Sequence, residues 1–286
     1  MKRIFILFSL FFYLLSFSQK IENLPLHKYR LATLSDSLLE TSGLTFLKDK
    51  LYTFNDGGNL NEFYEISPEN GKILKKYKTT FPDIDWEAIT NDGENLYIGD
   101  FGNNAGKRKD LAVYQVNLQN TEFKKINFEY KDQTDFSPSY LNHDFDAEAM
   151  VFLDGKIHVF TKKWASKTVS HYILNVANSE KQTIENTESF NTEFVVTDAA
   201  YYQKKLYVVG YTREANVYMM IFEEGENEMF FVKNAIKYNL GSALTIGQVE
   251  GIAVNEKGIY ISNENFSKFI FHSKQSLYFI PFESLK

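Results

Sequence analysis

Short apolar strands separated by polar turns recur along most of the chain. Five segments share one order: a polar residue, a small or apolar pair, a turn, and a second apolar strand. Their anchoring polar residues are Ser42, Glu87, Glu148, Asp198 and Glu250. The anchors lie roughly 45 to 60 residues apart, a spacing typical of four-stranded repeat units rather than helical repeats.

Each repeat also contains a third apolar strand, and most contain a fourth, more polar one. The third strands are predicted at residues 63–66, 111–116, 171–174, 218–222 and 277–280, and fourth strands at, for example, 123–130 and 229–232. The last repeat lacks a fourth strand, which residues 29–34 could supply and so close a ring without open edges. We therefore predict an all-β, five-bladed β-propeller closed by an N-terminal strand, with six blades as the alternative.

The first 18 residues have the pattern of a secretory signal peptide. Lys2 and Arg3 precede an apolar run from Ile4 to Phe17, and small residues precede a cut at Gln19. The alternative is an uncleaved anchor, but about 14 apolar residues fall short of the roughly 20 that span a membrane. We expect a signal peptide at 1–18, one propeller domain at 19–286, no membrane span after cleavage, and export to the periplasm or the cell exterior.

Composition supports a β-rich exported chain. The sequence has 26 Phe and 18 Tyr, which suit pleated, half-buried surfaces, and no cysteine, which excludes disulfides and thiolate metal sites. The net charge of -6 is spread without long runs, so we expect no nucleic-acid partner. Five histidines show no metal-ligand spacing. We expect a monomer.

Acidic residues alternate with apolar ones just before two of the repeats. Residues 83–87 read Asp-Ile-Asp-Trp-Glu and residues 144–148 read Asp-Phe-Asp-Ala-Glu. Successive side chains of an extended chain point to opposite faces, so the acids of each phrase share one side. Trp86 should then point away from the channel, into the core.

The five anchors should form a ring around the central channel if the first strand of each blade is innermost. Crowded carboxylates raise one another's pKa or attract a cation, and calcium accepts six to eight oxygens in irregular geometry. We therefore expect a calcium ion as cofactor, with Ser42, Glu87, Glu148, Asp198 and Glu250 as its ligands. The alternative is that these acids bond only to water and backbone amides.

A hairpin returns the chain to the face it left, so the loops after each second strand should surround this ring. Their carboxamides, aromatics and cations could bind a substrate. The predicted substrate-binding residues are Asn55, Asp56, Asp100, Asn103, Lys163, Trp164, Tyr211, Arg213, Asn263 and Glu264, and the predicted catalytic residues are Asp85, Asp144 and Asp146 as bases and Lys162 for developing charge.

Two resemblances extend this interpretation. The phrases Asp-Trp-Glu-Ala-Ile at 85–89, Asp-Ala-Glu-Ala-Met at 146–150 and Glu-Gly-Ile-Ala at 250–253 resemble secreted bacterial propellers related to the esterase-like phytase and SdiA-regulated families. The phytase relatives are six-bladed, which the five repeats here do not match. The acidic ring is similar to that of soluble calcium-activated nucleotidases, five-bladed propellers whose inner strands present Ser or Glu to one central calcium. That family's pattern places a hydroxyl residue where Asp198 stands, and Thr197 is adjacent.

Two functions follow. The first is a calcium-dependent phosphoester or phosphoanhydride hydrolase acting on a small anionic substrate. The second is a non-catalytic propeller that binds a glycan, peptide or protein partner of the cell envelope. A serine esterase is less favoured because no Gly-x-Ser-x-Gly phrase occurs.

Overall fold

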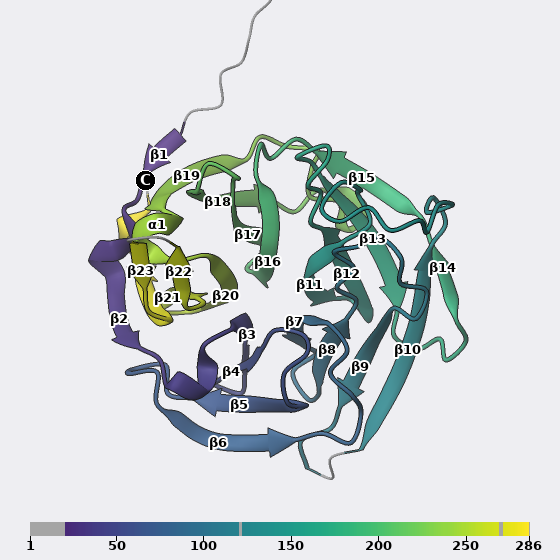
Figure 1. Cartoon of the computed structure of the whole chain (residues 1–286), viewed down its shortest axis with the longest axis horizontal. Helices are drawn as coiled ribbons and strands as arrows, with labels where there is room; N and C mark the ends of the chain where they lie inside the picture. Colours follow the sequence, from purple (N-terminus) through teal and green to yellow (C-terminus); the bar gives the residue numbers. More distant parts are fainter. Residues whose placement is uncertain (1–20, 120–121, 269–270, 286) are drawn as a thin grey trace, which may run out of the picture.

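The computed structural model describes residues 21–119, 122–268 and 271–285, and within them it is a five-bladed β-propeller (Figure 1). The predicted signal peptide lies outside the described residues. The prediction of five blades is confirmed and the alternative of six is wrong. Within the described part of the chain, no helix has the length and apolar character needed to cross a membrane.

The blades follow one another along the chain, each with its first strand nearest the centre of the ring. Blade I consists of β3 (Thr41–Leu47), β4 (Lys50–Asn55), β5 (Glu62–Ile66) and β6 (Ile73–Lys78). Blade II consists of β7 (Trp86–Asn91), β8 (Leu96–Asp100), β9 (Ala112–Val116) and β10 (Phe123–Tyr130), with β14 (Gln182–Ile184) added in parallel to β10. Blade III consists of β11 (Ala147–Leu153), β12 (Lys156–Thr161), β13 (Val169–Asn175) and β15 (Asn186–Phe190).

Blades IV and V also take in the N-terminal segment. Blade IV consists of β16 (Val195–Tyr202), β17 (Lys205–Tyr211), β18 (Asn216–Glu223) and β19 (Ile236–Ser242), with β1 (Ile21–Asn23) in parallel to β19. Blade V consists of β20 (Val249–Asn255), β21 (Gly258–Asn263), β24 (Ser276–Pro281) and β2 (Arg30–Thr33). The remaining elements are the hairpin of β22 (Phe266–Lys268) and β23 (Phe271–Ser273), helix α1 (Ala243–Ile246), and the short 3₁₀ turns η1 (Leu26–Tyr29), η2 (Asp36–Leu38), η3 (Glu226–Glu228) and η4 (Phe282–Ser284).

The N-terminal strand closes the ring as predicted. β2 pairs antiparallel with β24, with Thr33 opposite Ser276, and so becomes the fourth strand of blade V. The parallel pairing of β1 with β19 was not predicted. Together β1 and β2 join blades IV and V, which removes the open sheet edge that a linear series of blades would leave.

One predicted fourth strand is wrong. Residues 229–232 form a loop, and the fourth strand of blade IV is β19. The backbone N–H groups of Phe230 and Phe231 donate to the carboxylate of Glu188 at 2.7 and 2.8 Å. Phe230 is fully buried against the rings of His158 and Phe160. A charged acceptor and an aromatic pocket on blade III therefore hold this segment out of the sheet.

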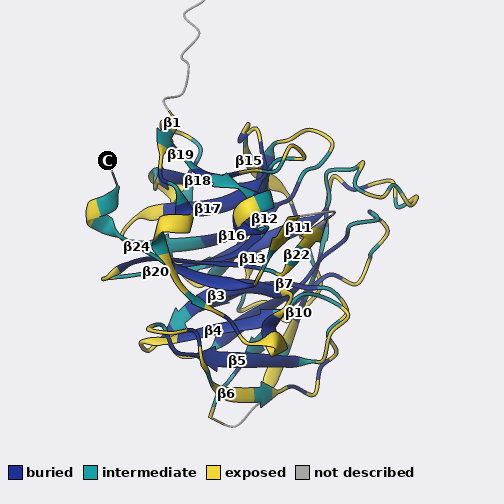
Figure 2. Cartoon of the chain, turned by 60° about the vertical axis from the view of Figure 1, so that its left-hand side comes forward, coloured by how far each residue is buried: buried dark blue, intermediate teal, exposed yellow. Residues whose placement is uncertain are grey.

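Burial follows the distance from the ring centre. Inner and middle strands are buried, whereas the outer strand β6 is mostly exposed (Figure 2). Aromatic side chains fill the space between neighbouring blades. Trp86 is fully buried and packs against Phe54 and Phe81, which confirms its predicted place in the core. The rigid inner strands are the scaffold on which the acidic residues sit.

Candidate functional site

A β-bulge interrupts the first strand of every blade, at the repeat anchor in blades II, III and V and next to it in blades I and IV. The pairing skips Glu87 between Trp86 and Ala88, and it skips Glu148 and Glu250 in the same way. In blade IV the skipped residue is Thr197, so Thr197, not Asp198, is equivalent to these three glutamates. A bulge re-aims its residue away from the ladder, which explains how the anchors can face the channel entrance.

Asp198 and Ser42 join blades to one another. The fully buried carboxylate of Asp198 accepts from the backbone N–H of Leu44 at 3.2 Å and of Ile252 at 2.7 Å. The Ser42 hydroxyl donates to the carbonyl of Glu87 at 3.2 Å, and the Thr197 hydroxyl donates to the carbonyl of Val249 at 2.6 Å. Among the predicted metal ligands, Asp198 and Ser42 therefore already serve contacts between blades.

Three carboxylates converge at the mouth of the channel. Asp56, Asp85 and Glu87 each offer one oxygen, and these oxygens lie within 4.8 Å of one another. Asp56 follows β4 of blade I, whereas Asp85 and Glu87 flank the start of β7 in blade II. Asp56 was predicted to bind substrate, and its place beside Glu87 was not foreseen because it comes from a different repeat. We call these three residues the carboxylate triad.

Two glycines leave room for the triad. A Cβ atom on Gly102 would overlap Glu87 Oε1 and lie 2.6 Å from Asp85 Oδ2, and one on Gly57 would overlap Asp85 Oδ1. The Gly102 N–H also donates to the Asp85 carbonyl at 3.1 Å. The triad therefore lies in a pocket that a side chain at either glycine would fill.

If the triad binds the calcium ion predicted from the sequence, Gly102→Ala should weaken that binding at least about tenfold while changing the melting temperature little. The new methyl group meets the movable ends of two side chains, which can turn aside but then no longer converge. Gly58→Ala is the matched control. Gly58 has φ +83°, and a methyl group there would meet no described atom within 4 Å, so this variant should cost about 1 kcal/mol of stability and keep calcium affinity. Calorimetric calcium titration and thermal melts measure both; equal affinity in Gly102→Ala contradicts the assignment.

Burial changes the acidity of most carboxylates around the mouth. It raises the pKa of Asp85 to about 6 and that of Asp146 and Glu250 to about 7. It also raises the pKa of Glu87 and Glu148 well above the usual value, and neighbouring acids add to the effect. At neutral pH several of these carboxyl groups are therefore protonated, and a bound cation could displace their protons.

Lys162 is the buried cation of this region. Its ammonium pairs with Glu148 Oε1, and it lies 5.6 Å from the ring centres of both Trp164 and Tyr211. Burial opposes its charge, but the negative groups around it, Glu148 first and then Tyr211, Glu250 and Asp146, together outweigh burial and raise the pKa of Lys162 well above its usual value. Lys162 therefore stays charged and neutralises one of the ring acids.

Arg108 is a second, partly buried cation that orders the loop beside the triad. Its guanidinium donates to Asp100 Oδ1 at 2.8 Å and to the Gly102 carbonyl at 3.0 Å. Its backbone N–H donates to Asn103 Oδ1 at 2.9 Å, and the Asn103 N–H donates to Asp146 Oδ1 at 2.7 Å. Asp100 and Asn103 thus position the loop, and Asp146 Oδ2 has no partner among the described residues.

A cavity of about 470 Å³ adjoins the acids on the side of blades IV and V. Its lining includes Trp164, Tyr211, Arg213, Gln248 and Phe271. The Tyr211 hydroxyl donates to Glu250 Oε1 at 3.0 Å, which connects the cavity wall to the acidic mouth. Arg213 lies 5.4 Å from the Trp164 ring centre. Three predicted substrate-binding residues therefore lie together, and we call this space the aromatic cavity.

The other predicted site residues have local roles. Asp144 accepts from the Ser166 N–H at 3.2 Å, and burial lowers the pKa of Lys163. Asn55 donates to the Ser37 carbonyl at 2.9 Å, and Asn263 donates to the Glu264 carbonyl at 2.7 Å. Burial raises the pKa of Glu264 to about 9, with Glu250 adding to the effect. Of these five residues, Glu264 therefore interacts electrostatically with a ring acid, Glu250.

A comparison with protein-family models finds no match for this sequence, and neither does a comparison with curated proteins. The resemblances to phytase-like propellers and to calcium-activated nucleotidases therefore stay predictions from short phrases. What the structure shows is the five-bladed propeller fold of this chain.

Proposed function

We propose that the mouth of this propeller binds a calcium ion through the carboxylate triad of Asp56, Asp85 and Glu87. The donors are all oxygens, which suits a hard divalent cation, and they come from two blades, which suits an ion that tolerates irregular geometry. The convergence of three half-buried or buried carboxylates within 4.8 Å is the observation that carries the proposal. The glycine pocket supports it, as do the buried oxygens Asp100 Oδ2 and Asp146 Oδ2, which have no hydrogen-bond partner among the residues that the structure describes.

The activity we propose is calcium-dependent hydrolysis of a phosphoester or phosphoanhydride. Bound calcium would supply positive charge for a phosphoryl group. Asp146 is suited to take a proton from water, because burial raises its pKa to about 7 and one of its oxygens is free of protein partners among the described residues. The aromatic cavity would hold the rest of the substrate. Export to the periplasm or cell exterior, from the predicted signal peptide, is part of the proposal.

A non-catalytic role in the envelope is the second candidate, and one observation favours it. Lys162 and Arg108, two buried or partly buried cations of the mouth, are already paired with carboxylates. The surrounding acids outnumber them, and this negative field opposes an anionic substrate. A propeller that binds a glycan, peptide or protein partner would not meet this difficulty.

One assay distinguishes the two proposed functions: phosphate release by the purified chain from a panel of nucleotides and phosphomonoesters. The hydrolase proposal predicts release with excess calcium that stops with chelator and falls at least about a hundredfold in Asp146→Asn. Glu87→Gln should lose both release and the rise in melting temperature that calcium gives. If calcium raises the melting temperature but no substrate of the panel releases phosphate, the hydrolase proposal fails and the non-catalytic binding role stands.

A further inference from the structure

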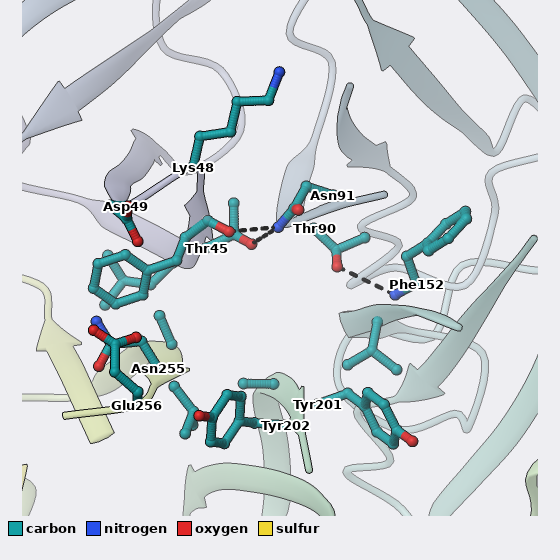
Figure 3. A pocket seen from close by; sticks show the side chains of 16 residues that line it. Thr45, Lys48, Asp49, Thr90, Asn91, Phe152, Tyr201, Tyr202, Asn255 and Glu256 are labelled. Atoms are coloured by element: carbon teal, nitrogen blue, oxygen red, sulfur yellow. Dashed lines mark hydrogen bonds between the residues drawn. The ribbon is translucent and has the colours of Figure 1, made fainter. Parts of the chain in front are cut away.

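The opposite end of the channel holds a second cavity. It has a volume of about 350 Å³ and is lined by residues of all five blades. These residues, several of which are labelled in Figure 3, lie at the ends of the inner strands and in the hairpin turns that follow them. The carboxylate triad lies at the other end of these strands, after β4 and at the start of β7. No residue of the proposed calcium site contributes to it. We call it the rear cavity.

Two threonine hydroxyls in the rear cavity each accept one hydrogen bond from the protein and can still donate one. Asn91 Nδ2 donates to Thr45 Oγ1 at 2.8 Å, and the Phe152 N–H donates to Thr90 Oγ1 at 3.2 Å (Figure 3). A hydroxyl carries one donor hydrogen besides its lone pairs, and no described residue accepts from either threonine. The neighbours thus fix two O–H donors at the cavity wall.

Aromatic rings complete the walls, and each is supported from behind. Phe46 contacts Tyr260 edge-on at 5.0 Å between ring centres, and Phe152 stacks on Tyr97 at 5.4 Å. Tyr202 stacks on Phe282 at 6.1 Å. These three rings are only half-buried, so each keeps an open surface. Braced rings offer flat apolar surfaces at little entropic cost.

The charges at the rim disfavour an anion. Asp49 and Glu256 carry carboxylates at the rim of the cavity, whereas the Lys48 ammonium points away from the other labelled side chains (Figure 3). A ligand that fits fixed O–H donors and apolar ring faces without needing positive charge is neutral and rich in oxygen. The volume is near the lower end for ligand pockets, which run from about 300 to 1,000 Å³, so one ring suffices to fill it.

We propose that the rear cavity binds a neutral sugar of one ring. Thr45 and Thr90 donate to its oxygens, and Phe46, Phe152 and Tyr202 pack against its C–H faces. The site is independent of the proposed calcium site, so it stands whether or not the mouth is catalytic.

Calorimetric and NMR titrations with glucose, galactose, mannose and N-acetylglucosamine test this, with glucuronate as the charged comparison and chelator present throughout. Saturable binding of at least one neutral sugar, and weaker binding of glucuronate, is expected. Thr90→Val and Thr45→Val should each weaken that binding about five- to tenfold through the lost hydrogen bond. Thr90→Ser keeps the hydroxyl and should bind as the parent does.

Two further variants locate the site. Ala200→Phe places a ring in the cavity and should abolish sugar binding, while its melting temperature should respond to calcium as that of the parent does. Thr183→Val removes an exposed hydroxyl on β14 and should change nothing, as a matched control. Absence of saturable binding with all four neutral sugars overturns the proposal, as does equal affinity in the parent and both valine variants.

Discussion

With chelator present, the free energy of unfolding is expected to fall by several kcal/mol between about pH 5 and pH 8. Burial raises the pKa of four mouth acids in the folded protein to about 6 or 7, from ordinary values of 3.8 for Asp and 4.5 for Glu. These are Asp83, Asp85, Asp146 and Glu250. Each unit of raised pKa corresponds to about 1.4 kcal/mol.

The sign follows from proton binding. Between the unfolded and folded pKa values the folded chain holds more protons, so stability is complete below about pH 4 and is lost as pH rises through 6 to 7. Glu264, whose pKa burial raises to about 9, extends the loss to higher pH. Carboxylates in ordinary surface ion pairs act in the opposite direction, so the trend is specific to the mouth.

Calcium provides the second arm of this experiment. Under the calcium proposal the ionised carboxylates bind the ion, so saturating calcium should remove most of the fall in stability by pH 8. Denaturant unfolding at a series of pH values, with and without calcium, measures both curves. Asp146→Asn should flatten the chelator curve, whereas Asp135→Asn, at an exposed acid, should not. Stability that rises from pH 5 to pH 8 under chelator would contradict this account of the mouth.

The fold could be predicted from sequence because local sequence patterns determine the strands and turns of each repeat. Two-residue turns such as Asp154-Gly155, both with positive φ, alternate with apolar strands and fix one hairpin per repeat. The sequence also shows that the last repeat lacks a fourth strand and that an N-terminal segment can supply it. The segment around Phe230 was misassigned because its loop depends on Glu188, an acceptor in another blade that no local pattern reveals.

The site could be predicted only in part, since alternation gives the face of a side chain but not its partner. Glu87, Glu148 and Glu250 could be placed on the inner strands because their repeats align. In blade IV the bulge falls on Thr197, one residue before Asp198, and the short repeat phrase alone does not distinguish these two positions. Asp56 and Asp85 can approach each other because Gly57 and Gly102, in two different loops, have no side chain to fill the space around Asp85.

Lys162→Met is expected to lower the free energy of unfolding by about 3–5 kcal/mol at pH 8 under chelator. The Lys162 ammonium and the Glu148 carboxylate are both buried and paired, and removal of one partner leaves an uncompensated charge. Because burial already raises the pKa of Glu148, this carboxylate can take up a proton instead. The loss should therefore shrink near pH 5, and equilibrium unfolding at the two pH values measures it.

The matched control for Lys162→Met is Lys131→Met, which breaks an exposed ion pair with Glu185 and should cost less than about 1 kcal/mol. Adding Glu148→Gln to Lys162→Met should restore part of the loss, because the double variant buries no unpaired charge at this position. A loss in Lys162→Met no larger than in Lys131→Met would mean that Glu148 is already neutral in the parent. In that case Lys162 does not neutralise the ring, and the mouth carries less negative charge than its count of carboxylates implies.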